Sequence, residues 1–185
     1  MKKIATTNLL LRRLMLSALC FPLFACDGNT ELMKHALDGN AIAVETDLSN
    51  GSAVDERNNF GWTALMHAAR QNQPAIMAVL IDAGADINAQ DNDGWTPLMR
   101  ATAKGNADAV ELLLQRNANI ELADHNGWTP VLWAATRGHV EVLKMLIAKG
   151  ADINVKGKDG RSAVFLARNE GHNDILKVLQ DAGAK

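Results

Sequence analysis

The chain has 185 residues, of which 48% are hydrophobic and 22% are charged, and its formal net charge is −2. This apolar share is enough for a folded core and excludes a disordered tail. The length suits one compact domain or one short array of repeats.

The N-terminal segment has the composition of a secretory signal peptide. It holds no acidic residue before Asp27, and its basic residues are Lys2, Lys3, Arg12 and Arg13. Its apolar run, 14–24, is shorter than the roughly 20 residues that a membrane-spanning helix needs. A positive start, a short apolar run and a small residue at the end, here Ala25, are typical of a cleaved export signal. We therefore expect 1–25 to be a signal peptide and the protein to lie in the periplasm of a bacterial cell envelope.

The end of this segment, Leu23-Phe24-Ala25-Cys26, resembles the lipobox of bacterial lipoproteins. In that motif the cysteine receives diacylglycerol and becomes the new N-terminus, although Phe24 is bulkier than the usual occupant. The alternative is ordinary cleavage near Ala25, which leaves Cys26 as an incidental thiol. We expect lipidation of Cys26, with 26–29 as a short anchor segment that holds the protein on a membrane.

Removal of the signal peptide changes the charge of the chain. Without its four basic residues, 15 Lys and Arg remain against 21 Asp and Glu, which gives a formal charge of −6. An acidic exported chain is not expected to bind nucleic acid, because nucleic-acid binding depends on neutralising phosphates with Lys and Arg. Cys26 is then the single cysteine, so no disulfide within the chain is expected.

The remainder of the chain repeats itself every 33 residues. One series of glycines is Gly61, Gly94, Gly127 and Gly160, and a second series with the same spacing is Gly84, Asn117, Gly150 and Gly183. Self-similarity at such a period is typical of a solenoid. The repeat predicts one domain over 30–185 with five units at about 28–57, 58–90, 91–123, 124–156 and 157–185.

The third unit shows the chemistry of one repeat. Asp93-Gly94 favours a tight turn, and Thr96-Pro97 combines a good N-cap with a residue suited to the first helical position. Gly105-Asn106 ends this helix, and Asn117 can adopt the left-handed conformation that ends a second one. We expect Ile120-Glu121 to be extended. Since one helix pair cannot bury its apolar face alone, the pattern predicts an all-α solenoid of helix-turn-helix units with β-turn or hairpin tips.

This pattern resembles the ankyrin repeat, a family with a 33-residue period and a Thr-Pro-Leu-His-x-Ala signature. The matching stretches are 94–98, Gly-Trp-Thr-Pro-Leu, 127–131, Gly-Trp-Thr-Pro-Val, and 150–154, Gly-Ala-Asp-Ile-Asn. The signature His is absent, and its place is taken by Met33, Met66, Met99, Leu132 and Phe165. We expect apolar packing to replace the hydrogen bonds of that His.

The resemblance implies that partners dock on the concave face, which the tips and the exposed side of each first helix form. The tip residues there are Trp62, Trp95 and Trp128, and the helix residues are His67, Arg100, Trp133, Arg70, Lys104 and Arg137. We expect the indoles to follow one another at the roughly 8–10 Å spacing of packed helices. Two interpretations stay open for the indoles, contact with a partner or packing on their neighbours, and the cations could be an ordinary solvated face.

These features predict a non-enzymatic protein–protein interaction module of the cell envelope. A hydrophobic and cationic groove suits an acidic or aromatic segment of a partner protein. No catalytic set, metal site or cofactor is expected, because His139 and His172, and likewise Asp86 and Asp152, recur with the repeat as packing and turn residues. The alternatives are a purely structural or protective accessory of an envelope enzyme, and a small-molecule binder or hydrolase.

Overall fold

The protein is described by a computed structural model over residues 27–184, so the predicted signal peptide and Cys26 lie outside the described residues. Within this range the chain forms ten helices and no strand. Their bounds are α1 Glu31–Asp38, α2 Ala41–Ser49, α3 Ala64–Arg70, α4 Pro74–Asp82, α5 Pro97–Lys104, α6 Ala107–Gln115, α7 Pro130–Arg137, α8 Val140–Ala148, α9 Ala163–Asn169 and α10 Asn173–Asp181.

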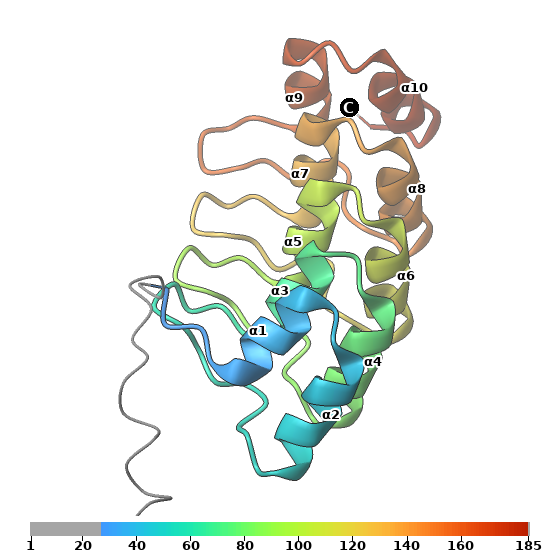
Figure 1. The fold of residues 1–185 in the computed structure, drawn as a ribbon. Helices are drawn as coiled ribbons and strands as arrows, with labels where there is room; N and C mark the ends of the chain where they lie inside the picture. The colour runs from blue at the N-terminus through green and yellow to red at the C-terminus, as the bar shows by residue number, and fades with distance from the viewer. Residues whose placement is uncertain (1–26, 185) are drawn as a thin grey trace, which may run out of the picture.

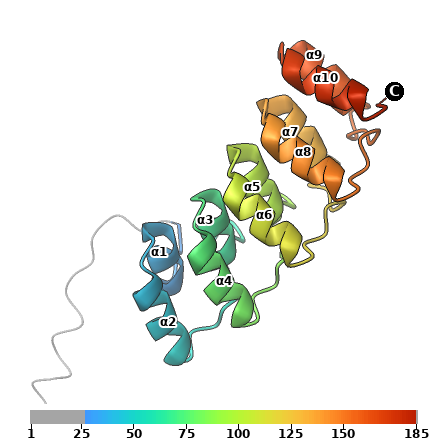
Figure 2. The same ribbon diagram turned by 90° about the vertical axis from the view of Figure 1, so that its right-hand side faces the viewer.

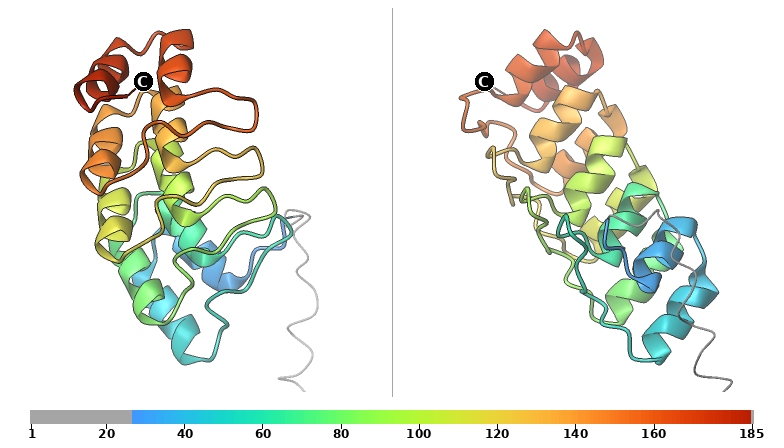
Figure 3. Two further views of the ribbon diagram at one scale, coloured as in Figure 1. Left: turned by 180° about the vertical axis from the view of Figure 1, so that it is seen from behind. Right: turned by 60° about the vertical axis from the view of Figure 1, so that its left-hand side comes forward.

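The helices form five antiparallel pairs stacked in one direction (Figure 1). The odd-numbered helices make one layer, here called the inner helices, and the even-numbered helices make a second layer, the outer helices (Figure 2). The loops that join one pair to the next project to one side of the stack as tips (Figure 3). The predicted all-α solenoid of helix-turn-helix units is therefore confirmed.

The ends of the helices follow the local chemistry that the sequence indicates. Thr96 caps α5 by accepting a hydrogen bond from the Met99 amide at 3.2 Å, and Pro97 is its first residue. Gly105 ends α5 in the left-handed conformation, and Asn117 follows α6 with φ of 61°. The same threonine or serine cap begins α1, α3 and α9.

The core is a continuous apolar layer between neighbouring pairs. At the position of the missing signature His, four side chains are at most 1% exposed, namely Met33, Met66, Met99 and Leu132. The expected apolar substitution is therefore confirmed for these four units. Phe165 occupies the same position in the last unit but is 52% exposed, because none of the described residues continues the stack beyond it.

Polar side chains at the start of the outer helices fix the register between units. Each one bonds to a backbone carbonyl within the inner helix of the preceding unit. These bonds are Gln73 to Leu37, Asn106 to Ala69 and Arg70, His139 to Ala103 at 3.3 Å, and His172 to Thr136 at 3.0 Å. The packing role predicted for His139 and His172 is confirmed, and equivalent residues of successive units are thereby held beside one another.

The segment after each outer helix differs from the prediction. Ile120-Glu121 is a turn rather than extended chain. The cause is the Asn119 side chain, whose oxygen accepts from the Glu121 amide at 2.9 Å and folds the backbone back locally. Asp86 and Asp152 do the same in their units, so their predicted role as turn residues is confirmed.

Candidate functional site

The concave surface is built on a buried polar residue at the base of three tips, here called the tip acceptors. They are Asn58, Asp91 and Asp124, which are 8%, 6% and 4% exposed. In each, one side-chain oxygen accepts from the backbone amides two and four residues later, at 2.8–3.0 Å. The second of these amides belongs to Trp62, Trp95 or Trp128. The tip acceptors therefore fix the backbone of each tip tryptophan.

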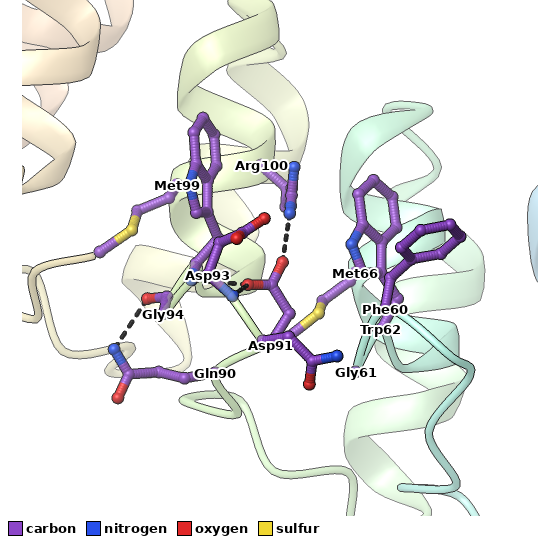
Figure 4. A network of polar contacts seen from close by, with 12 residues as sticks. Phe60, Gly61, Trp62, Met66, Gln90, Asp91, Asp93, Gly94, Met99 and Arg100 are labelled. Carbon is purple, nitrogen blue, oxygen red and sulfur yellow. Dashed lines mark hydrogen bonds and ion pairs between the residues drawn. The ribbon is translucent and has the colours of Figure 1, made fainter. Parts of the chain in front are cut away.

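The other side-chain atom of each tip acceptor connects the tip to an inner helix. Asp91 pairs with the Arg100 guanidinium of α5 (Figure 4). The equivalent oxygen of Asp124 accepts from the Trp133 indole N–H at 3.2 Å. In the first of these tips, Asn58 donates to the Asn29 oxygen at 2.6 Å, and the same oxygen lies 3.2 Å from His67 Nε2. The helix residues predicted to be equivalent, 67, 100 and 133, thus share one structural role.

These helix side chains fill the spaces between successive tip indoles. The Arg100 guanidinium carbon lies 4.0 Å from the Trp62 ring centre and 4.4 Å from that of Trp95. The Trp133 ring lies 4.3 Å from Trp95 and 4.7 Å from Trp128. One aromatic–guanidinium stack results, which runs through His67, Trp62, Arg100, Trp95, Trp133, Trp128 and Arg161. The tip indoles are therefore packed through interleaved side chains, while their contact with a partner stays a prediction.

Two of the predicted surface residues are buried. His67 is 7% exposed, so the prediction that it lies on the exposed side of α3 is wrong: Asn29 and the Trp62 ring cover it. Trp128 is 9% exposed because the last tip closes over it, where a side chain at Gly157 would come within 2.7 Å of the indole nitrogen. Trp62, Trp95 and Trp133 are half-buried, and the Arg100 side chain is only 15% exposed.

The other predicted cations lie at the surface. Arg70, Lys104 and Arg137 are exposed residues in the last turns of α3, α5 and α7. The guanidinium of Arg70 lies 5.5 Å from the Trp62 ring centre, and that of Arg137 lies 5.8 Å from Trp133. Among the described residues, none of the three forms an ion pair with an acidic side chain.

Two shallow hollows open on this surface. The larger, of about 400 Å³, is lined by Trp62, Arg70, Asp93 and Arg100, and also by Phe60, which is 58% exposed. The smaller, of about 320 Å³, lies beside Trp128 and Trp133 and is lined on its other side by Asp159 and Arg161. Hydrogen bonds from Arg161 lower the pKa of Asp159 below its ordinary value.

The sequence patterns did not single out Phe60 or the tip acceptors. A signal for the acceptors was available, because Asn58, Asp91 and Asp124 recur at the 33-residue spacing. In the described part of the chain, no three His, Cys, Asp or Glu side chains gather closely enough to hold a metal ion. None of the helices described is long and apolar enough to cross a bilayer.

Comparison with known proteins gives one clear match. A family model described as ankyrin repeats (3 copies) matches residues 23–124 and 116–185. No curated protein matches the chain at a significant level.

Replacement of Asp91 by Ala is expected to lower the free energy of unfolding by about 3 kcal/mol, because it leaves the Arg100 guanidinium unpaired between two indoles. Urea titration measures the change. The exposed neighbour Asp93 provides the control, since Asp93→Ala is expected to change stability by less than about 0.5 kcal/mol. Adding Arg100→Met to Asp91→Ala should recover about 1–3 kcal/mol of the lost free energy of unfolding, because the unpaired charge is then removed. Equal effects of Asp91→Ala and Asp93→Ala would contradict the structural role of the pair.

His67 is expected to make stability depend on pH. Burial lowers its pKa from 6.5 to about 4, with Asp27 opposing the shift and Arg70 and Arg100 adding to it. Below pH 6.5 the unfolded chain therefore takes up a proton that the folded chain refuses until about pH 4. Stability should fall as the pH drops through this window, and thermal melts should show a shallower fall for His67→Gln. His125→Gln, at an exposed position, should keep the original slope; the same slope for His67→Gln would refute this role.

Proposed function

We propose that this chain, which belongs to the ankyrin repeat family, is a non-enzymatic protein–protein interaction module of the bacterial cell envelope. Ankyrin repeats generally serve as scaffolds for binding other proteins, and their binding residues differ from one member to the next. The partner proposed here is another envelope protein, which docks on the concave face between the tips and the inner helices.

One observation carries this proposal: the concave face combines a rigid aromatic stack with exposed cations that have no acidic partner among the described residues. A surface of fixed side chains loses little conformational entropy on binding, which favours affinity. Trp and Arg are also the residues most enriched where binding energy concentrates. Half-buried Trp62, Trp95 and Trp133, together with exposed Phe60, offer the apolar part of such a contact.

The envelope location is proposed from the sequence alone. A signal peptide over 1–25 directs export, and a lipid on Cys26 anchors the chain. Cys26 is close in sequence to α1, which begins at Glu31. Because Glu31 is five residues from Cys26 and five residues extend at most about 18 Å, the first unit would lie near the membrane surface, and partners close to that membrane would meet the solenoid first.

A photo-reactive phenylalanine analogue tests where the partner docks. At Phe60, which is 58% exposed beside the larger hollow, it should crosslink a discrete partner in intact cells. Phe165 is a matched control, since it is also a phenylalanine, is 52% exposed, and lies in α9 of the last unit, where it lines neither hollow. Mass spectrometry identifies the product. Crosslinks of equal yield and identity from both positions, or none from Phe60, would count against docking on the concave face.

Replacement of Cys26 by Ala tests the anchor. The change should abolish labelling by a fatty-acid analogue and shift the protein from the membrane fraction to the soluble periplasmic fraction. Cys20→Ala is the control and should keep both properties, because Cys20 lies within the segment predicted to be removed. Labelling that persists without Cys26 would show that this cysteine is not the lipid attachment site.

A further inference from the structure

The cations of the concave face fall into two classes. Arg100 and Arg161 are already paired, the first with buried Asp91 and the second with Asp159 at 2.7 Å. Arg70, Lys104 and Arg137 are exposed and have no ion pair among the described residues. These three are called the basic rim below. The two classes differ in the net electrostatic attraction that they offer to a carboxylate of a partner.

A carboxylate that approached Arg100 would have to compete with Asp91. Breaking that pair would strand a buried charge, which is costly in free energy. A carboxylate that approaches the basic rim meets cations that are still available, so the attraction is not offset by the loss of an existing pair. Recognition of charge therefore falls to the basic rim, while Arg100 supports the stack between Trp62 and Trp95.

The basic rim is short and bounded by acidic residues. Its members come from three successive inner helices, α3, α5 and α7. In the first and last units, the positions equivalent to Lys104 and Arg137 hold Asp38 and Glu170, both exposed. A further acid, Asp93, lies on the tip before α5 and lines the same hollow as Arg70. A continuous anionic surface or a polyphosphate chain would meet these acids, whereas a discrete peptide segment can reach the three cations alone.

We propose that the basic rim binds three acidic side chains, about 10 Å apart, on a segment of the partner protein. This inference rests on the proposed function and specifies the chemistry of the partner. Packed helices lie roughly 8–10 Å apart, so the equivalent residues Lys104 and Arg137 should lie at about that interval. Arg70 extends the row by one helix, although it comes one residue before the equivalent position of its unit, Gln71. A helix rises about 10.5 Å in seven residues, so acidic residues seven apart along one helix match the rim. Because Arg70 and Arg137 lie beside Trp62 and Trp133, apolar neighbours of those acids would contact the stack.

Binding of a synthetic helical peptide tests the spacing. The probe is an alanine-based peptide with three Glu residues placed seven apart, each followed by Leu, and the reference peptide has the same composition with the three Glu adjacent. Titration calorimetry with the purified protein should show the spaced peptide binding about tenfold more tightly than the reference. Equal affinities, or no binding of the spaced peptide, would overturn the proposal.

Charge reversal tests the residues. The triple change Arg70→Glu, Lys104→Glu and Arg137→Glu should weaken binding of the spaced peptide at least about tenfold, from three lost surface pairs and the repulsion that replaces them. A matched control reverses three exposed lysines of the outer helices and their ends, Lys144, Lys149 and Lys177, and should bind as the original does. A second rim variant replaces the same three residues with Gln, which avoids placing acids at helix C-termini. Circular dichroism verifies the fold of each variant.

The outcomes separate the two proposals. Equal losses in the rim and control variants would overturn the role of the basic rim, and so would unchanged binding by folded rim variants. In either case, a partner crosslinked specifically from Phe60 would leave the proposed function standing. Vesicles of phosphatidylglycerol distinguish a lipid ligand: rim-dependent binding to vesicles, with no binding of the spaced peptide, would overturn the assignment to a protein segment.

Discussion

The concave surface depends on one interaction, the hydrogen bonds that the tip acceptors make at the base of three tips. Asp91 shows it most fully: one oxygen holds the backbone amides of Asp93 and Trp95, and the other pairs with Arg100 of the following helix. A buried carboxylate is stable only when its oxygens are satisfied. The tip shape, the position of the indole and the side chain beside it are therefore fixed together, and a change in one disturbs the others.

Positions 67, 100 and 133 are equivalent in successive units and hold three different side chains, because the stack gives each position the same surroundings. His67, Arg100 and Trp133 are all planar and can all donate a hydrogen bond, to Asn29, Asp91 and Asp124 respectively. Each also lies against a tip indole. Planarity and a donor edge are the common requirement, and charge is not. This explains why Arg100 contributes to structure although it resembles the freely exposed Arg70 and Arg137 in the sequence.

The two ends of the solenoid lack a neighbour on one side among the described residues. At the last unit, Phe165 is exposed, and a Cβ atom added at Gly160 or Gly171 would meet nothing within 4 Å. At the equivalent Gly94 and Gly138, an added Cβ atom would lie only 2.9 Å from His125 and His172 of the next unit. Terminal units of a solenoid make half the inter-unit contacts and open most easily. The basic rim lies on the three central units, where both neighbours hold the helices in place.

The repeat, the helix pairs and their caps could be predicted from the sequence, because they depend on local chemistry. Thr96 caps α5, Gly105 ends it, Asn117 follows α6 in the left-handed conformation, and Met99 is an apolar side chain at a buried position. The sequence also placed the tip indoles and the cations on one face. Which of these side chains are exposed to a partner is seen only in the folded solenoid. His67 and Trp128 are buried and Arg100 is paired because of groups that a neighbouring unit or a folded tip brings against them, namely Asn29, Gly157 and Asp91. The burial of His67 and Trp128 arises from contacts between segments distant in sequence, and the pairing of Arg100 depends on how its tip folds back against α5. Periodicity identifies equivalent positions without showing what covers each one.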